Sequence, residues 1–401
     1  MSEDHHNAGV GDIFRVYGND YRSIRNVPAS HLKVMQALGA CRTAVLGGHL
    51  YHCDCCNYEH VAYNSCCNRH CPQCQNLKKA KWLEARKNEV LPATYFHNVF
   101  TLPHELNPWI RYNKRLLYDI LFQSVADTLL EFGANAKNGL DGQLGFIAAL
   151  HTWDQRMMEH NHLHCLIPGG ALSSDKQRWI SANPEFLFPV KALSPVFKAK
   201  FIDSLEQTFD NGLLICPEGR DFYQLLSRLR KIAWVVYSKP SFAGPEKVLD
   251  YLGRYVNRVA ISNERIKKIA DGKVTFSYKD RKHQNSKKEL TIPATEFIRR
   301  FLTHVLPDNF RKIRYYGFLS NRYKKENIVK IKTILDQFDN NALAAAIHKT
   351  PTELMFELTG KDITKCPKCR NGKMVMIRVI HPEQDIRPPD IINSPPVIDS
   401  S

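Results

Sequence analysis

The hydrophobic pattern through the middle of the chain predicts strands on both sides of one long helix. Residues 95–103 form an apolar stretch that ends at a proline, as strands often do, whereas residues 113–132 have the apolar spacing of a helix. A second apolar strand is expected at 145–153, and the polar residues 154–159 join it to a third at 160–168. So short a connection predicts an antiparallel hairpin. The sequence therefore predicts an α+β fold built on an antiparallel sheet.

Further elements are expected before and after this region. Helices are predicted at residues 13–24, 30–38 and 296–306, a helical, basic region at 197–230, and strands at 233–237, 274–278 and 289–292. The proline-containing residues 238–240 are expected to turn away from the strand before them. Residues 381–401 are rich in proline and aspartate and are expected to be disordered.

Three histidines share one face of the strand predicted at the end of the hairpin. His160, His162 and His164 occupy alternate positions, so their side chains project to the same side, while Leu163 and Cys165 point to the other. Imidazole is a common ligand of divalent first-row metals, and neighbouring strand positions can hold two nitrogens close enough for one ion. The row therefore predicts a metal site. The alternative is a half-buried strand with surface histidines.

The cysteines provide a second chemical signal. Most of the 12 lie between Cys41 and Cys74, in a segment with little periodic pattern, which is typical of a region folded around metal. Two Cys-x-x-Cys pairs in this segment have the spacing of zinc knuckles. They predict one tetrahedral zinc bound by Cys53, Cys56, Cys71 and Cys74.

A second zinc is also considered. Its candidate ligands are Cys41, His49, Cys66 and His70, with Cys55, Cys67, His52 and His60 as competing candidates. The alternative is that these residues only pack around a single zinc. Cys366 and Cys369 form a late pair without obvious partners, which is either half a zinc knuckle or an exposed turn. Cys165 and Cys216 stand in apolar runs and are expected in the core.

Positive charge is in large excess along the whole chain. The 401 residues include 56 Lys and Arg against 40 Asp and Glu, a net charge of +16. This balance favours a nucleic-acid partner over an acidic membrane, and no apolar stretch of about 18 residues or signal peptide is visible. The protein is therefore expected in the cytosol. Candidate phosphate contacts are Lys78, Lys79 and Lys81, on a helix predicted after the cysteines, and Arg314, among aromatic residues.

A helix that begins at a proline is predicted at residues 245–259. Tyr251 and Tyr255 are four residues apart and share one face, while Arg254 and Arg258 share another and are candidate DNA contacts. A divalent cation polarises the oxygens of a phosphodiester, and a tyrosine hydroxyl can then act as the nucleophile. The products are a covalent phosphotyrosine and a free 3′ hydroxyl. Such chemistry suits DNA strand transfer better than hydrolysis, because the phosphoester bond is kept.

Several short motifs occur in a fixed order along the chain. They are Cys41-Arg42-Thr43-Ala44 with Gly47-Gly48-His49, Asn64-Ser65-Cys66, Asn68-Arg69-His70-Cys71-Pro72 with Cys74, His151-Thr152-Trp153 with Gln155, His162-Leu163-His164-Cys165, Tyr251-Leu252 with Arg254-Tyr255-Val256-Asn257-Arg258, and Tyr316-Gly317-Phe318-Leu319. Together they resemble the HUH-type two-tyrosine rolling-circle transposases of the insertion sequence 91 family. The resemblance covers roughly residues 10–330.

This resemblance implies an antiparallel-sheet, palm-like HUH nuclease core with an N-terminal zinc-binding module and helical additions. His162 and His164 look like the metal ligands, and Tyr251 and Tyr255 like the two nucleophiles. Gln155 fits the position of a third ligand, with His160 as the alternative. The implied cofactors are one or two structural Zn²⁺ ions and a catalytic Mg²⁺ or Mn²⁺. The implied partners are single-stranded DNA, the element ends and target DNA, in the nucleoid of a bacterial cytoplasm.

The expected organisation follows from the motifs and the resemblance together. It comprises an N-terminal helical segment (1–40), a zinc-binding and DNA-binding module (41–90), the nuclease core (91–300), a basic helical extension (301–350), and a cysteine pair with a disordered tail (351–401). An HUH replication initiator or relaxase-like nicking enzyme shares this chemistry, although the zinc module favours transposition. A non-catalytic zinc-dependent DNA-binding protein leaves the histidine row and the tyrosine pair unexplained. A metallohydrolase barrel needs repeated βα units, which the sequence lacks.

Overall fold

The computed structural model of the protein describes residues 8–241, 248, 253, 259–280, 283–335 and 349–382. Most of the helix predicted at 245–259 therefore lies outside the described residues. This includes the four residues singled out there, which are Tyr251, Arg254, Tyr255 and Arg258. The tail beyond residue 382 lies outside them as well.

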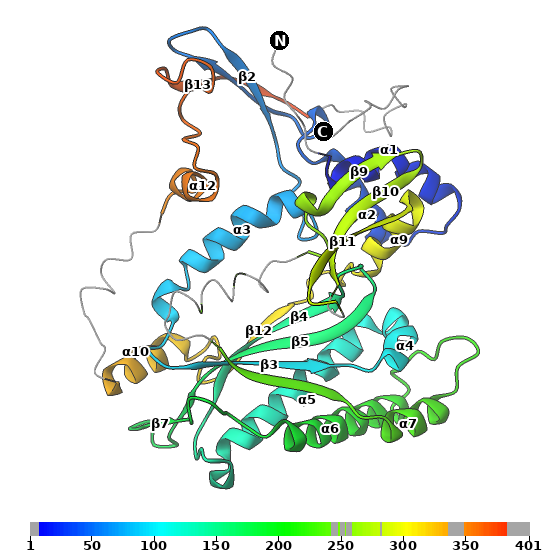
Figure 1. Ribbon diagram of the computed structural model, residues 1–401, viewed down its shortest axis with the longest axis vertical. Coiled ribbons are helices and arrows are strands. Elements are labelled where there is room, and N and C mark those ends of the chain that lie inside the picture. The colour runs from blue at the N-terminus through cyan, green and yellow to red at the C-terminus, as the bar shows by residue number, and fades with distance from the viewer. Residues whose placement is uncertain are drawn as a thin grey trace.

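An antiparallel sheet with the strand order β12-β4-β5-β3-β8 forms the centre of the protein (Figure 1). Its strands are β3 (Tyr95–Thr101), β4 (Gly145–Trp153), β5 (Glu159–Pro168), β8 (Val235–Ser241) and β12 (Ile313–Gly317). β4 and β5 form the predicted hairpin, in which Ile147 is paired with Leu166. The prediction of a mixed fold on an antiparallel sheet is thus confirmed.

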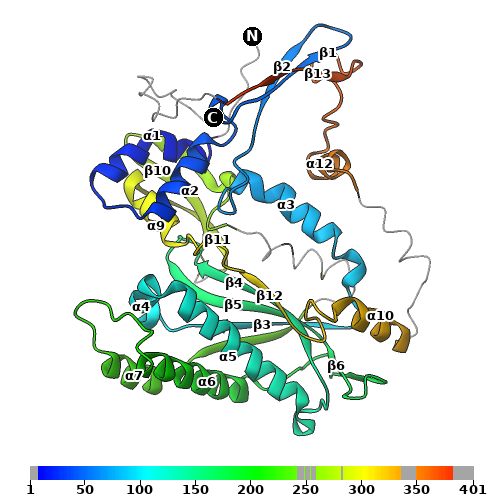
Figure 2. The same cartoon turned by 180° about the vertical axis from the view of Figure 1, so that it is seen from behind.

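Helices cover one face of this sheet, as both Figure 1 and Figure 2 show. They are α4 (Asn107–Tyr112), α5 (Lys114–Ala134), α6 (Val190–Asp210) and α7 (Phe222–Lys231). Phe100, Phe146 and Leu163, one from each of three neighbouring strands, are fully buried in the core between sheet and helices. Because side chains alternate along a strand, His162 and His164 beside Leu163 point to the opposite face.

The helical region predicted at 197–230 is confirmed and consists of α6 and α7. Another prediction about this layer is corrected by the structure. Residues 238–240 do not turn away but continue β8, where Pro240 is paired with Phe96 of β3. Proline is tolerated there because β8 is an edge strand among the described strands, so the missing N–H breaks no ladder.

A second core joins the N-terminal helices to residues 266–303. Its elements are α1 (Val10–Ser23), α2 (Ala29–Ala40), α9 (Ala294–Thr303), and a sheet of β9 (Ile266–Ala270), β10 (Lys273–Asp280) and β11 (Ser286–Pro293). Val10, Ile13 and Phe14 are buried on one face of α1, at the spacing of an amphipathic helix. Phe14 packs edge-to-face on Phe301 of α9, with ring centroids 5.4 Å apart. The N-terminal segment therefore shares a core with residues far along the chain.

A third sheet, at one end of the molecule, joins strands from the N-terminal and C-terminal parts of the described chain (Figure 1). β1 (Gly48–Cys53) pairs with β2 (Glu59–Tyr63) on one side and with β13 (Met374–Ile380) on the other. α3 (Pro72–Glu84) leads from this sheet towards the central one, and α12 (Pro351–Thr359) packs against α3. α12 and β13 are not among the elements that the sequence predicts.

The other described elements are short. They are β6 (Gly170–Leu172), β7 (Trp179–Ser181), α10 (Lys324–Ile334), and the 3-10 helices η1 (Ala44–Leu46), η2 (Lys87–Glu89), η3 (His104–Leu106), η4 (Ala136–Asn138) and η5 (Asn263–Arg265). Among the helices of the described ranges, none combines the length and the apolar character needed to cross a bilayer.

Candidate functional site

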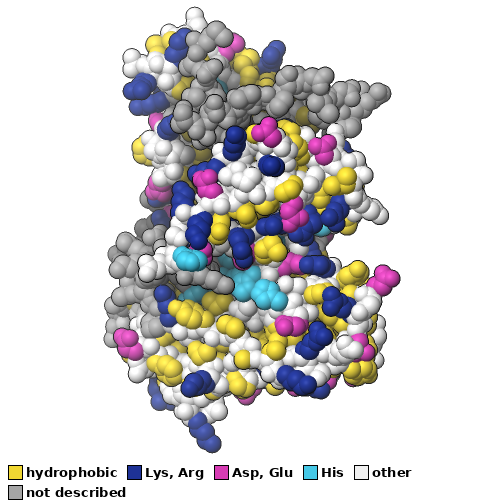
Figure 3. Space-filling view, turned by 45° about the vertical axis from the view of Figure 1, so that its right-hand side comes forward, with side chains coloured by type: hydrophobic (Ala, Val, Ile, Leu, Met, Phe, Trp, Pro, Cys, Tyr) yellow, Lys and Arg dark blue, Asp and Glu magenta, His cyan; other side chains and the backbone are white. Residues whose placement is uncertain are grey.

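Three histidines converge on the face of the central sheet that lies opposite the helices. His162 and His164 lie on β5, and His151 on β4 is paired directly with His162. Their ligand nitrogens all lie within 4.8 Å of one another. The Nε2 atoms of His162 and His164 are 3.0 Å apart. Figure 3 shows a histidine patch at the waist of the molecule, with Lys and Arg side chains nearby.

Hydrogen bonds behind the rings decide which nitrogens face one another. His162 Nδ1 lies 2.7 Å from the carbonyl oxygen of His160, so we assign the proton to Nδ1 and a lone pair to Nε2. His164 Nδ1 lies 2.8 Å from His97 Nε2. Burial and the Lys239 cation lower the pKa of His97 to about 4, so its neutral ring can accept the His164 hydrogen bond. Both inward Nε2 atoms are thus available as ligands.

The three imidazoles fit one divalent ion. Two ligand nitrogens about 2.1 Å from an ion and at right angles to each other are separated by about 3 Å. The 3.0 Å between the Nε2 atoms of His162 and His164 agrees with this value. Three protein ligands are typical of catalytic sites, because a position stays open for substrate.

The structure places His151 in this cluster, whereas His160, one of the two residues predicted as the third ligand, lies outside it. Gln155 lies in the turn between β4 and β5, where its carbonyl oxygen accepts a hydrogen bond from Arg265. His160 shares the strand face of His162, as predicted, but is outside the cluster and stacks on His104, with ring centroids 5.7 Å apart. The predicted hairpin could have indicated His151, because residues paired across antiparallel strands lie side by side on one face of the sheet.

A small pocket beside the cluster is lined by basic groups. Trp153 stacks on His151, with ring centroids 4.8 Å apart, and lines this pocket together with Arg69, His70, His304 and Lys312. Burial lowers the pKa of His304 to about 4 and that of Lys312 to about 7. His304 is therefore neutral at physiological pH, while Arg69 stays cationic. A positive charge next to the histidines favours an anionic substrate.

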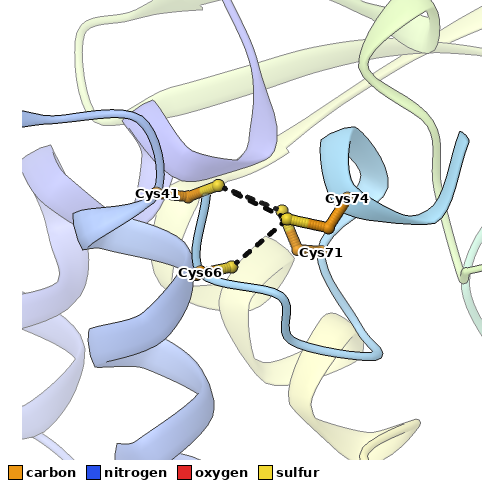
Figure 4. Close-up of side chains that lie close together, drawn as sticks. All are labelled: Cys41, Cys66, Cys71 and Cys74. Carbon is orange, nitrogen blue, oxygen red and sulfur yellow. Dashed lines mark hydrogen bonds between the residues drawn. The ribbon is translucent and has the colours of Figure 1, made fainter. Parts of the chain in front are cut away.

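Four cysteines meet where α2 approaches α3 (Figure 4). Cys41 caps the end of α2, Cys66 lies in the loop before α3, and Cys71 and Cys74 lie at the start of α3. The sulfur atoms of Cys41 and Cys71 are 3.6 Å apart, and both Cys41 and Cys66 place theirs 3.7 Å from Cys74. Zinc–sulfur bonds of about 2.3 Å in a tetrahedron separate the sulfurs by about 3.8 Å, so the group fits one structural zinc.

Cys53 and Cys56 belong to a different group. Their partners are Cys366 and Cys369, from the C-terminal segment. The structure thus corrects the predicted grouping of these two residues with Cys71 and Cys74. The physical reason is the position of the two Cys-x-x-Cys pairs. Cys53 is the last residue of β1 in the third sheet, whereas Cys71 and Cys74 lie at the start of α3 and pack in the core with α1 and α2.

The histidines considered for a second zinc lie outside the cysteine groups of the described residues. His49 is on β1, and its Nδ1 is buried without a hydrogen-bond partner among the described atoms. His70 lines the pocket next to Trp153, where burial lowers its pKa to about 3. The cysteines predicted with them, Cys41 and Cys66, belong to the group at α3.

Other cysteines differ in their exposure. Cys55 and Cys67, the competing zinc candidates, are exposed and lie outside both groups. Cys165 lies on β5 and is fully buried in the core between the sheet and the helices, as predicted. Cys216 is exposed, so its predicted place in the core is wrong.

The basic residues predicted to contact DNA have different surroundings. Three of them are on α3, where Lys78 and Lys81 are exposed and Lys79 is partly buried. Arg314 lies on the helix-covered side of the sheet, 4.1 Å from the ring centre of Phe122 and paired with Asp119. Its guanidinium therefore already has partners within the fold, and its contact with DNA stays a prediction.

Two family models match the chain. The model described as "Transposase zinc-binding domain" matches residues 13–102, which include the four-cysteine group at α3. The model described as "Putative transposase" matches residues 145–327, which include the three converging histidines. Both candidate metal centres thus fall within ranges that transposases share.

Similar proteins span most of the chain. A protein of Sinorhizobium fredii (strain NBRC 101917 / NGR234) named "Putative transposase y4qJ" is 44% identical over 378 residues, covering 92% of this chain and 95% of the relative. The "Transposase for insertion sequence element IS801" of Pseudomonas savastanoi pv. phaseolicola is 29% identical over 308 residues, covering 73% of this chain and 71% of the relative. This chain is therefore a transposase, a class of enzyme that acts on DNA. It belongs to the insertion sequence 91 family and contains a transposase zinc-binding domain.

Proposed function

We propose that this transposase cleaves and rejoins single-stranded DNA and so moves an insertion sequence by a rolling-circle-like route. The observation that carries the proposal is the convergence of His151, His162 and His164 on one face of the central sheet. A protein that only binds DNA has no need for three imidazoles at metal-ligand spacing in largely buried positions, because burying polar groups is unfavourable. This arrangement is the one expected of an HUH nuclease.

The residues around the cluster prepare it to hold Mg²⁺ or Mn²⁺. Such an ion, when bound, would polarise the non-bridging oxygens of a phosphodiester. The His160 carbonyl and His97 hold the rings of His162 and His164 with Nε2 inward. Trp153 packs on the His151 ring and limits its rotation.

We propose Tyr251 and Tyr255 as the nucleophiles, on the strength of the sequence motif and of the described residues near them. Val248 is fully buried in one cluster with Leu166, and Leu166 shares the strand face of His164. A Cβ atom on Gly253 would lie 2.9 Å from Lys79 Cε on α3. In the sequence these two described positions lie on either side of Tyr251, so the described residues that flank the motif pack near the histidine face and against α3.

The proposed cleavage conserves the phosphoester bond. The phenolic oxygen of one tyrosine attacks the phosphorus and forms a bond to the 5′ phosphate. The bond from phosphorus to the 3′ oxygen breaks, the phenol loses its proton, and the 3′ oxygen takes one up. Since one phosphoester replaces another, attack by a 3′ hydroxyl on the phosphotyrosine can rejoin strands without a further energy source.

The proposed DNA partners are the element ends and a target strand. Lys78, Lys79 and Lys81 lie along α3, and their ammonium groups are proposed to bind the phosphates of a strand that approaches the histidine face. We propose a single strand as substrate, because the sheet must reach the scissile phosphate from one side and a tyrosine from the other. Arg254 and Arg258 stay candidate phosphate contacts from the sequence alone.

Cleavage should depend on a divalent ion. Purified protein with a labelled single-stranded oligonucleotide from an element end should give a cleaved product on a denaturing gel in Mg²⁺ or Mn²⁺. Chelation that leaves the zinc content unchanged should slow the reaction by at least about 100-fold, because polarisation of the phosphate is lost. The same sequence as a duplex is the control and should stay intact. Undiminished cleavage after chelation would contradict the proposed site.

His97 is expected to position His164 and not to bind the ion. His97→Phe keeps a ring in place but removes the acceptor 2.8 Å from His164 Nδ1, so the metal affinity should fall by about 10- to 100-fold. The maximal rate at saturating Mn²⁺ should stay close to that of the unaltered protein. His97→Gln supplies a new acceptor oxygen and should recover much of the affinity. A metal titration of cleavage measures both values, and an unchanged affinity in His97→Phe would exclude this role.

A further inference from the structure

The cysteine pair near the C-terminus has partners in the third sheet. Cys366 and Cys369 lie just before β13, and the pairing of β13 with β1 brings them to Cys53 and Cys56. We call these four residues the terminal cysteine group. The matched zinc-binding domain ends at residue 102, so it includes only half of this group.

The sulfur atoms of the terminal cysteine group have the spacing of zinc ligands. Cys53 Sγ is 3.7 Å from Cys369 Sγ, and Cys56 Sγ is 3.6 Å from Cys366 Sγ. A zinc tetrahedron with bonds of about 2.3 Å places sulfurs about 3.8 Å apart. The group at α3 has the same spacing, from 3.6 to 3.7 Å. The donor set is therefore as complete as that of the family's own zinc domain.

Backbone N–H groups point at two of these sulfurs. Cys55 N–H donates to Cys53 Sγ at 3.4 Å, and Gly372 N–H donates to Cys369 Sγ at 3.3 Å. Such donors stabilise a thiolate, which is the form that binds zinc. The backbone around each Cys-x-x-Cys pair thus donates at least one hydrogen bond to a sulfur of that pair.

The two turns are fitted closely to each other. Asp54 N–H donates to the carbonyl of Lys373 at 3.1 Å, and its carboxylate accepts from Lys373 N–H at 2.8 Å. A Cβ atom on Gly372 would lie only 2.5 Å from Cys53 Sγ, so a side chain there would displace the sulfur. Glycine is required because backbone and sulfur approach so closely.

The sheet around this group has little apolar core of its own. The side chains of Val375, Met376, Ile377 and Val379 on β13 are between 47% and 53% exposed. A small sheet with so much exposed apolar surface needs another source of stability, such as a disulfide or a metal. The four sulfurs provide the second of these, since metal binding to such ligands contributes directly to folding.

We propose that the terminal cysteine group binds a second structural zinc, which ties the C-terminal segment 349–382 to the N-terminal sheet. This zinc holds β13 on β1 and thereby keeps α12 against α3, the helix that carries Lys78, Lys79 and Lys81. The zinc-binding part of the protein is then built from both ends of the chain. Removal of the C-terminal segment leaves Cys53 and Cys56 with half a site.

Metal analysis of the full-length protein tests this proposal. The unaltered protein should contain two zinc ions per chain, and the double variant Cys366→Ser, Cys369→Ser should contain one. Cys53→Ser, Cys56→Ser should lose the same single ion, and a variant with all four changes should lose no more. Cys216→Ser, which removes an exposed cysteine outside the group, is the matched control and should keep both. Equal zinc in the unaltered protein and in the Cys366, Cys369 variant would overturn the proposal.

A measurement on the unaltered protein covers the case in which the variants fail to fold. Alkylation followed by mass spectrometry should modify Cys216 at once but leave Cys369 protected, although Cys369 is only partly buried. Stepwise chelation should expose Cys53, Cys56, Cys366 and Cys369 together, and a protease should then release the C-terminal segment. Alkylation of Cys369 as fast as Cys216 before chelation would overturn the proposal. Neither readout depends on DNA cleavage, so the proposed catalytic function is not tested by them.

Discussion

His151→Ala is expected to slow the cleavage of single-stranded DNA by about a thousandfold or more, whereas Gln155→Ala should change the rate by no more than about threefold. The loss of one of three imidazoles removes a ligand from the cluster, and stabilisation by a bound ion accounts for several kcal/mol of the barrier. Gln155 lies in the hairpin turn, where its backbone carbonyl accepts a hydrogen bond from Arg265, and the three imidazoles form a ligand set that does not need its side chain.

Single-turnover cleavage at saturating protein and a fixed Mn²⁺ concentration separates the two variants. His162→Ala is the positive reference and should be as inactive as His151→Ala. His160→Ala is a matched control from the same strand face and should behave like Gln155→Ala. Circular dichroism and zinc content should be unchanged in all four variants. If Gln155→Ala loses activity while His151→Ala keeps it, the third ligand is the residue that the sequence favoured.

The face of the histidine strand could be predicted from the sequence because the strand period is two. Leu163 and Cys165 are fully buried under the helices, as the pattern requires, and His162 and His164 point the other way. The third histidine depends on the register between β4 and β5. That register shifts between His151 and Trp153, so counting from the turn does not locate it reliably.

The cysteine groups show a second limit of sequence spacing. A Cys-x-x-Cys pair supplies two of the four ligands of a zinc site, and its spacing does not reveal which residues supply the other two. The knuckle at Cys53 and Cys56 is near in sequence to the one at Cys71 and Cys74, which made that pairing the simplest hypothesis. The true partners are set by the pairing of β1 with β13, a contact between distant parts of the chain. Long-range strand pairing of this kind leaves no local signal in the sequence.

Arg314 shows why charge alone is a weak guide to DNA binding. Its aromatic neighbours in the sequence suggested a base-stacking surface. The alternation along β12 instead turns its guanidinium towards Phe122 and Asp119, under the sheet. The lysines of α3 differ from Arg314 because Lys78 and Lys81 lie on an exposed face of that helix. A basic residue on a strand therefore needs its face determined before it is assigned to DNA.

The double variant Tyr251→Phe, Tyr255→Phe is expected to form no covalent adduct with a labelled single-stranded oligonucleotide. Phenylalanine keeps the ring but lacks the attacking oxygen, so the bond to phosphorus cannot form. Residues four apart on an α-helix lie about 6 Å apart along its axis, so two tyrosines at this spacing can serve one phosphate site but not at the same time. At least one of the single variants should therefore lose the adduct as well.

A slowly migrating band on a denaturing gel, removed by protease, measures the adduct. Tyr237→Phe is the matched control, because Tyr237 is a half-exposed tyrosine on β8. Val99 on β3 is paired with Tyr237 on one side and with His164 on the other, so the two side chains lie on the same face of the sheet. It presents a phenol on the histidine face, so a general effect of losing such a group would appear there too. The Tyr237→Phe variant should keep the adduct, and all variants should bind the oligonucleotide as the unaltered protein does. An adduct that survives in the double variant but disappears in Tyr237→Phe would assign the nucleophile to β8.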